Sequence, residues 1–320
     1  MITLLLGRSG SGKTGKIINS IGENARRGEK GQLLIVPPQF THETERRLCQ
    51  RGGDSICLSA EVLSFERLGQ RVFSQVGGGG RQLLDLPGRL LIMRLAIKSV
   101  EGSLQVYSGL SRPHALQSAL EMVEELESCA VTPADLERAG AEAGGSLGKK
   151  LNDAALILAA YDALLSTGLS DRLHDMARLC RALECSDFAA GKKIYADGFG
   201  WFTALEQECL YQLVRGGAEL TVSVTWDEDD EAFMLQRRAL GAVRRIAQRA
   251  GKKVRTIWCE KTGNKPESLE FIEENFFAGE VKKFGGKCDN IRLYLAEDPF
   301  AECRLAAARA VELVRKEGLR

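Results

Sequence analysis

A glycine-rich segment near the start of the chain has the residue types that bind phosphate groups. Four residues separate Gly7 from Gly12, and Lys13 and Thr14 follow directly. In this pattern the glycines let backbone N–H groups converge on a phosphate, the lysine reaches the β- and γ-phosphates, and the hydroxyl holds Mg²⁺. The sequence therefore predicts a site for ATP with Mg²⁺. Its residues are Gly7, Arg8, Ser9, Gly10, Ser11, Gly12, Lys13 and Thr14.

A carboxylate is expected to complete this site from a distant part of the chain. Asp197 directly follows a short apolar run at 193–196. Phosphate-binding loops of this type work with an aspartate at the end of a second strand, which holds Mg²⁺. A turn aspartate in front of a glycine is the alternative interpretation. We predict Thr14 and Asp197 as the magnesium ligands.

The position next to Asp197 bears on hydrolysis. In motor ATPases a glutamate commonly follows the magnesium-binding aspartate, whereas Gly198 stands here and has no side chain. The loss of a positioned base typically costs a factor on the order of 10² to 10⁴ in rate. We therefore expect ATP to be held but turned over slowly, and we assign no catalytic residue.

Such a site needs a parallel sheet that brings strand ends together. The first 75 residues alternate apolar runs with segments of helical periodicity, which predicts an α/β fold. The second of these helices has Thr41 as its expected N-cap. The expected strands are 2–6, 32–36 and 55–58, and the expected helices are 16–25, 39–50 and 65–73.

The middle of the chain has a different pattern. Between residues 86 and 183 almost every segment has helical periodicity, and no strand signal interrupts it. Strand patterns return at 193–196, 219–226, 254–259 and 291–295, and an amphipathic helix is expected at 299–320. We predict an α/β fold in which a parallel sheet with a phosphate-binding loop is flanked by helices and carries a large all-α insertion.

These patterns divide the chain into four expected parts. Residues 1–80 form the first part of the α/β core and 81–190 the helical insertion. Residues 191–295 continue the core, and 296–320 form a helix that leads to a missing C-terminal part.

The composition limits the classes of partner and compartment. The 44 Lys and Arg residues nearly balance 43 Asp and Glu residues, so bulk charge favours neither nucleic acid nor a membrane surface. The nine cysteines are scattered without a C-x-x-C motif, a spacing that suits neither a zinc site nor a disulfide framework. We therefore expect a cytoplasmic protein in a reducing compartment, with no membrane partner.

Several stretches together resemble the N-terminal region of the AddB family, the B subunits of bacterial ATP-dependent helicase/deoxyribonucleases. Their order and spacing also resemble a degraded UvrD-type helicase core, over residues 1 to about 215. The stretches are 7–14, 36–45, 62–68 and 197–199, with Phe202, Thr203 and Glu206.

The resemblance implies a helicase-like region that binds nucleotide and does not translocate. The complex would be a DNA helicase–exonuclease that processes double-strand breaks for recombinational repair. Its partners would be an A-type helicase–nuclease subunit, in a heterodimer, and the single-stranded end of a processed DNA duplex. The DNA-contact candidates are Gln39, Ser64 and Phe65. An iron–sulfur cluster and a nuclease domain are expected only beyond Arg320, so no cysteine here is assigned to a metal cluster.

Two other interpretations remain open. The chain could be an active UvrD-type DNA-dependent ATPase or helicase, with Glu206 as its base, although Glu206 lies well past the strand end. It could also be an unrelated small-molecule kinase with the same loop. A kinase would need acceptor-binding residues and a lid with several arginines, and the helical middle region carries no such signal.

Overall fold

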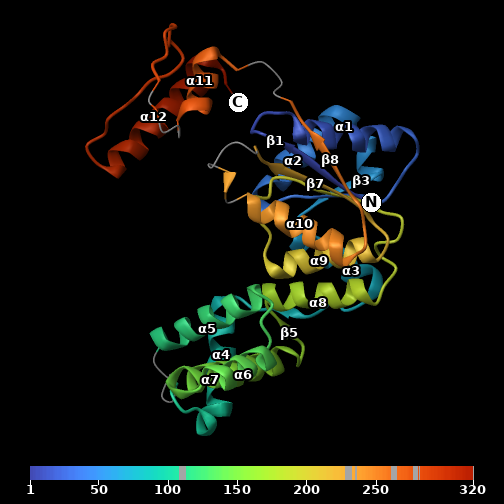
Figure 1. Ribbon diagram of the computed structural model, residues 1–320, viewed down its shortest axis with the longest axis vertical. Coiled ribbons are helices and arrows are strands. Elements are labelled where there is room, and N and C mark those ends of the chain that lie inside the picture. Colours follow the sequence, from blue (N-terminus) through green and yellow to red (C-terminus); the bar gives the residue numbers. More distant parts are fainter. Residues whose placement is uncertain are drawn as a thin grey trace. The chain divides into compact units, whose positions relative to one another are not determined.

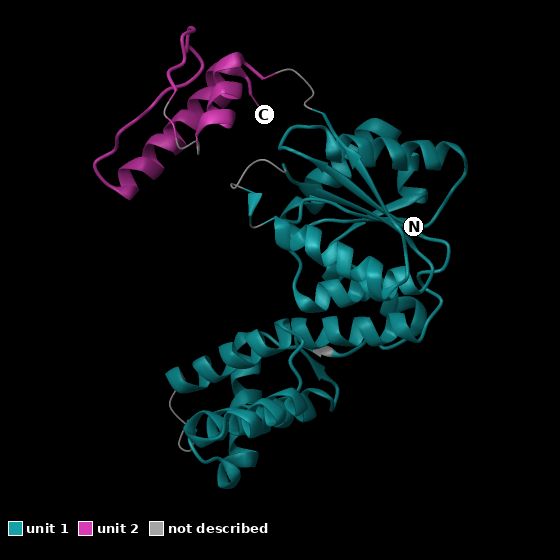
Figure 2. Cartoon of the chain, in the orientation of Figure 1, with its two compact units in different colours: residues 1–262 teal, residues 263–320 magenta. Residues whose placement is uncertain are grey.

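A computed structural model describes residues 1–107, 113–227, 233–234, 236–260, 265–276, 280 and 282–319. The chain divides into two compact units, residues 1–262 and 263–320 (Figure 2). The first unit ends earlier than residue 295, where we expected the α/β core to end. The boundaries expected at residues 80 and 190 stay a prediction.

A parallel sheet forms the centre of the first unit (Figure 1). In the part of the chain that the structure describes, it has six strands in the order β3-β2-β6-β7-β1-β8, and every neighbouring pair is parallel. The carboxyl ends of parallel strands meet at one edge of the sheet, so residues that follow different strands are brought together there. The strands are β1 (Ile2–Gly7), β2 (Gln32–Ile35), β3 (Ala60–Leu63), β6 (Lys193–Ala196), β7 (Glu219–Thr225) and β8 (Val254–Trp258).

Helices cover both faces of this sheet because its strands are apolar on both sides. Leu5 and Leu34 face one layer, in which Ile17, Ile18 and Ile21 of α1 are buried. That layer holds α1 (Lys13–Arg26) and α2 (Thr41–Gly52). The opposite layer holds α3 (Phe65–Val76), α8 (Arg172–Glu184), α9 (Ala204–Arg215) and α10 (Arg237–Arg249). The predicted α/β class is confirmed.

The helical insertion has an apolar core of its own. Met93, Ile157 and Tyr161 are completely buried in it. Its helices are α4 (Leu86–Val100), α5 (Pro113–Ser128), α6 (Pro133–Ala143) and α7 (Gly145–Leu165). Helix α8 packs instead against α3 and α9, and its Leu179 and Leu183 lie in the core of the opposite layer.

A short parallel pair of strands stands where the chain enters and leaves the insertion. Strand β4 (Gln82–Leu83) pairs with β5 (Leu169–Ser170). Strand β5 lies within residues 86–183, where the sequence carries no strand signal. Two-residue strands have no periodic pattern that a sequence could reveal, since alternation needs about four residues.

Three local predictions also differ from the structure. The strand expected at 55–58 is a 3₁₀ helix, η2 (Asp54–Leu58), and β3 begins two residues later. Thr41 is the first residue of α2 and not its N-cap, and its hydroxyl donates to the carbonyl of Pro38, which lies in η1 (Pro38–Phe40). The segment 291–295 is not a strand, and its Leu293 and Leu295 are 98% and 102% exposed.

The second unit contains α11 (Glu267–Asn275) and α12 (Pro299–Glu317). Helix α12 confirms the expected C-terminal helix, and Gly318 ends it with a φ of +65°. Arg320, which we expected to be the last residue of this helix, lies outside the described residues. Within the described ranges, every helix is too short or too polar to traverse a lipid bilayer.

Candidate nucleotide-binding site

The loop after β1 contains glycines with backbone conformations that other residues rarely adopt. Gly7, Gly10 and Gly12 have φ values of +154°, +77° and +77°, a region that only glycine enters at little cost. A Cβ atom on Gly7 would lie 2.5 Å from the carbonyl oxygen of Cys259 and 2.6 Å from the hydroxyl of Ser11. The glycines of the predicted loop are therefore required by backbone conformation and by close packing.

Helix α1 begins at Lys13 and directs its N-terminal end toward a cavity. Its N-cap residue Gly12 has no side chain that could accept hydrogen bonds from the first N–H groups. Those N–H groups and the helix dipole favour an anion at this position. The cavity has a volume of 580 Å³, and its lining includes Ser9, Gly10, Thr14 and Gly15.

The ammonium group of Lys13 lies folded over the loop. It donates to the carbonyl oxygens of Gly7 at 2.7 Å and Arg8 at 2.8 Å, and it lies 3.4 Å from the hydroxyl of Ser11. Burial lowers the pKa of Lys13, while Cys259 and Asp197 act in the opposite direction. An anion in the cavity would favour the charged form of Lys13.

Asp197 joins three elements at the carboxyl edge of the sheet. The hydroxyl of Thr14 in α1 donates to Asp197 Oδ2 at 2.7 Å, and the hydroxyl of Ser223 in β7 donates to Asp197 Oδ1. The structure thus brings together the two residues predicted as magnesium ligands. Mg²⁺ is usually bound by one or two protein oxygens together with phosphates and waters. This donor set therefore fits Mg²⁺ carried by a nucleotide, and the ligand role stays a prediction.

Neither position considered for a water-activating residue provides a suitable side chain at this site: Gly198 lines the cavity but is a glycine, and Glu206 lies elsewhere. Gly198 has a φ of +81°, and a Cβ there would lie 3.5 Å from Pro37 and 3.7 Å from Phe40. The carboxylate of Glu206 accepts from the backbone N–H of Thr203 at 2.9 Å, in a capping box at the start of α9. Burial raises the pKa of Glu206, which lines a different cavity.

Several residues of the nucleotide cavity have no signal in the sequence. Arg47 of α2, Ser223 and Thr225 of β7, and Gln236 also line it. Ser223 and Thr225 arrive there because β7 lies between β1 and β6, and strand order cannot be read from periodicity. Arg8, predicted as part of the loop, forms an ion pair with Asp227 at 2.5 Å.

The three DNA-contact candidates have different environments. Gln39 is exposed in η1. The hydroxyl of Ser64 caps α3 by accepting from the N–H of Arg67 at 3.2 Å. Phe65 is buried, with its ring centroid 5.6 Å from that of Phe199. Ser64 and Phe65 both line a second cavity of 460 Å³.

Comparison with known proteins identifies the family. A family model described as "ADDB, N-terminal" matches residues 4–273. The chain belongs to this family. The resemblance to the AddB family predicted from the sequence motifs is thereby confirmed.

Three curated relatives of the chain are each named as the B subunit of an ATP-dependent helicase/deoxyribonuclease. The chain is 28% identical over its whole length to the relative from Thermoanaerobacter sp. (strain X514), and covers 29% of that protein. It is 29% identical to the relative from Desulforudis audaxviator (strain MP104C), with 100% of the chain and 29% of the relative covered. It is 29% identical to the relative from Moorella thermoacetica (strain ATCC 39073 / JCM 9320), with 99% of the chain and 30% of the relative covered. The chain thus spans less than a third of the length of these AddB relatives.

Proposed function

We propose that this chain is a helicase-like region that binds ATP with Mg²⁺ and belongs to one subunit of an ATP-dependent DNA helicase–exonuclease. The observation that carries the proposal is the meeting of Thr14, Asp197 and Ser223 in front of the Lys13 loop. A glycine loop, an uncapped helix end, a buried lysine and a carboxylate with two hydroxyl partners are the groups that a magnesium–triphosphate complex requires.

Each residue has a distinct part in this binding. The N–H groups at the start of α1 hold phosphate oxygens, and Lys13 turns from the loop carbonyls toward the β- and γ-phosphates. Thr14 and Asp197 hold Mg²⁺, which neutralises phosphate charge. Because Gly198 has no side chain and Glu206 caps α9, hydrolysis is slow. The nucleotide then acts as a structural or conformational ligand, and the region does not translocate.

We place single-stranded DNA over Gln39 and the second cavity. The lining of this cavity includes the half-buried Phe199, with the buried Phe65 and Phe73 beside it, and aromatic faces are the usual platforms on which unpaired bases stack. Arg172 and Arg178 also line it, paired with Glu66 and Asp175.

The proposed assembly is a heterodimer with an A-type helicase–nuclease subunit. It would act in the cytoplasm on double-strand breaks destined for homologous recombination. This part of the proposal rests on the family and on the name of the relatives, which describes one of the subunits of a helicase/deoxyribonuclease. The nuclease domain and the iron–sulfur cluster stay expectations for residues beyond Arg320.

Nucleotide binding is tested by thermal unfolding with and without Mg-ATP. Ligand at 100 times its Kd should stabilise the folded chain by about 2.7 kcal/mol. We expect the Lys13→Ala variant to lose this stabilisation, measured against its own ligand-free baseline. Lys30→Ala, at an exposed lysine in the turn between α1 and β2, should keep it. Equal stabilisation of wild type and Lys13→Ala would contradict the proposal.

The same proteins separate the two other interpretations. Rapid, DNA-stimulated phosphate release that Lys13→Ala abolishes would make the chain a motor ATPase. Transfer of a phosphoryl group to a small acceptor would make it a kinase. We expect neither activity above a trace.

DNA binding is tested by fluorescence anisotropy with a labelled single-stranded oligonucleotide. Gln39→Ala should weaken binding severalfold, because it removes an exposed amide directly after Pro38, a residue that lines the second cavity. Gln117→Ala, at an exposed glutamine of the insertion, should bind like wild type. Identical affinities for the two variants would remove Gln39 from the proposed contact surface.

A further inference from the structure

Two cysteines that the proposed function does not use lie side by side at the end of α2. Cys49 is in the last turn of α2 and Cys57 is in η2, and their Sγ atoms are 3.5 Å apart. Cys57 is exposed and Cys49 is half-buried. An oxidant in solution can therefore reach one sulfur, and the second sulfur stands next to it.

The turn between them is fixed by backbone bonds and by glycine. The N–H of Gly53, whose φ is +74°, donates to the carbonyl of Cys49 at 2.8 Å, and the N–H of Ile56 donates to the carbonyl of Gly53 at 3.1 Å. A Cβ on Gly52 would lie 2.2 Å from Ile56, so only glycine permits this approach. The packing of this segment thus sets the distance between the two sulfurs.

A buried side chain anchors the same segment. Ile56, the residue before Cys57, is 3% exposed and packs in the apolar cluster that also contains Leu48, the residue before Cys49. Each cysteine therefore follows a residue that is held in the core. The pairing of the sulfurs is part of the fold.

We propose that Cys49 and Cys57 form a dithiol site that low-molecular-weight disulfides oxidise reversibly to an intramolecular disulfide. A disulfide needs its sulfurs about 2.05 Å apart, and rotation of the two side chains can supply the remaining approach. Disulfides in reducing compartments are typically transient and redox-sensing, which fits a pair with one exposed sulfur.

The chemistry is two successive exchanges. The Cys57 thiolate attacks the small disulfide, forms a mixed disulfide and releases one small thiol. The Cys49 thiolate then attacks Cys57 Sγ, closes the ring and releases the second small thiol. The protein loses two electrons and two protons, the small disulfide is reduced to two thiols, and excess thiol reverses both steps.

The site adjoins the phosphate-binding loop. Arg51 stands between the two cysteines in the chain, and with Arg47 it lines a hollow whose other walls include Thr14, Gly15 and Ile18 of α1. A disulfide ring at the end of α2 would thus enclose a residue that faces the first turns of α1.

Peptide mapping after controlled oxidation tests the proposal. The full chain is equilibrated with oxidised and reduced glutathione, its remaining thiols are alkylated, and it is digested with trypsin. Trypsin cleaves after Arg47, Arg51 and Arg67, so a 49–57 disulfide joins peptide 48–51 to peptide 52–67. We expect this linked pair to exceed the Cys57–glutathione adduct by at least about tenfold, because a neighbouring thiol acts at a high effective concentration. Dithiothreitol should remove the linkage.

Single substitutions distinguish the pair from ordinary exposed thiols. In Cys49→Ser, glutathione should accumulate on Cys57, because no second thiol resolves the adduct. Cys129→Ser, at another exposed cysteine, should leave the 49–57 linkage unchanged. A wild-type chain that accumulates the Cys57–glutathione adduct as fully as Cys49→Ser, without linked peptides, would overturn the proposal.

Discussion

At the scale of single residues, Asp197 has a carboxylate positioned for the proposed ligand, whereas the neighbouring Gly198 has no side chain. The carboxylate of Asp197 is held by two hydroxyls that come from different elements, Thr14 of α1 and Ser223 of β7. Gly198 has a backbone conformation that a side chain would strain. A glutamate cannot simply be placed next to the aspartate here, because the backbone that aims Asp197 itself requires a glycine.

This conflict leads to a prediction on stability. Gly198→Glu should lower the free energy of unfolding by about 1–2 kcal/mol, because a non-glycine residue is forced into the left-handed region. Gly200→Glu is the matched control, since Gly200 is also exposed and does not share the positive φ. It should change the free energy of unfolding by less than about 0.5 kcal/mol. Equal losses in urea unfolding would show that backbone strain at Gly198 is not the cause.

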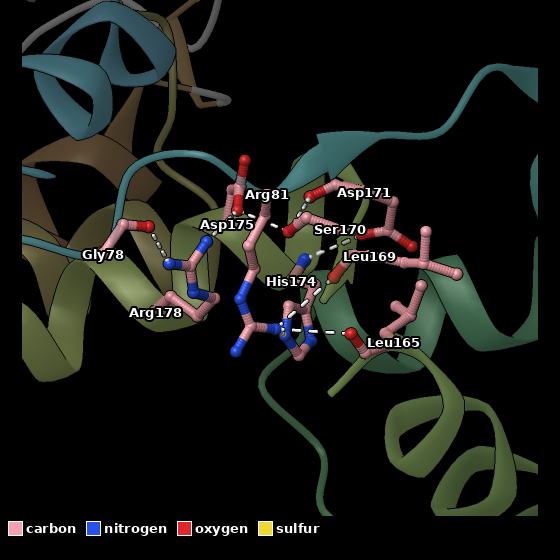
Figure 3. Close-up of polar contacts among 9 residues, drawn as sticks. All are labelled: Gly78, Arg81, Leu165, Leu169, Ser170, Asp171, His174, Asp175 and Arg178. Carbon is pink, nitrogen blue, oxygen red and sulfur yellow. Dashed lines mark hydrogen bonds and ion pairs between the residues drawn. The ribbon is translucent and has the colours of Figure 1, made fainter. Parts of the chain in front are cut away.

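At the scale of elements, two arginines link the segment that leads from the core into the insertion with the segment that returns from it (Figure 3). Arg81, just before β4, donates to the carbonyls of Leu165 at 3.3 Å and Leu169 at 3.4 Å, and lies 3.3 Å from His174 Nε2. Arg178 of α8 pairs with Asp175 at 2.7 Å and donates to the carbonyl of Gly78. The outgoing and returning segments are therefore held together by side chains as well as by the β4–β5 pair.

One buried and two half-buried residues with carboxyl groups lie next to this junction. Glu127 of α5 approaches Asp162 of α7 and Asp171, the N-cap of α8. Burial, with repulsion from Asp171 and Asp162, raises the pKa of Glu127 to about 9. Its Oε2 atom is buried without a hydrogen-bond partner among the described residues. The raised pKa favours the protonated form of Glu127 in the folded chain at neutral pH.

The raised pKa predicts how stability depends on pH. In the unfolded chain Glu127 has its ordinary pKa of 4.5, so between about pH 4.5 and 9 the unfolded state has lost a proton that the folded state keeps. The contribution of Glu127 to the free energy of unfolding therefore falls as pH rises through this window.

Glu127→Gln removes that contribution. We expect the variant to be more stable than wild type at pH 8, by on the order of 1 to 3 kcal/mol, with a difference that shrinks toward pH 5. Thermal unfolding of both proteins from pH 5 to 9 measures this difference in stability. Glu125→Gln, at an exposed glutamate of the same helix, is the control and should show no such trend. A pH-independent difference for Glu127→Gln would contradict the assignment.

At the scale of the whole molecule, the first compact unit contains every residue that we assign to nucleotide or DNA binding. The described apolar core clusters lie between Ile2 and Cys259, and the described lining of the nucleotide cavity lies between Ser9 and Gln236. In α12 of the second unit, no described residue is buried. The first unit therefore has the apolar interior that independent folding requires.

This division predicts the behaviour of fragments. Residues 1–262 alone should unfold cooperatively and keep the stabilisation by Mg-ATP. A fragment that ends at residue 215 should not fold, because it lacks β7, which lies between β6 and β1. Circular dichroism during heating measures the unfolding of both fragments. Loss of cooperative unfolding in the 1–262 fragment would show that the second unit is needed for stability.

The sequence by itself determined the features that depend on neighbouring residues. The glycine spacing and the Lys13–Thr14 pair need only a local turn and the start of a helix, so the loop could be predicted from its pattern. The alternation of strands and helices indicated the α/β class. Even the position of Asp197 beside Thr14 could be predicted, because the carboxyl ends of parallel strands always meet at one edge.

Tertiary structure alone decided the contacts between distant segments. The insertion of β7 between β1 and β6 brings Ser223 to Asp197, and the packing of α2 brings Arg47 to the cavity. The approach of Cys49 to Cys57 depends on how the chain turns after α2 ends. Periodicity reports which side of an element is apolar, but it does not say which element lies against that side, and that choice is made by the packing of the whole core.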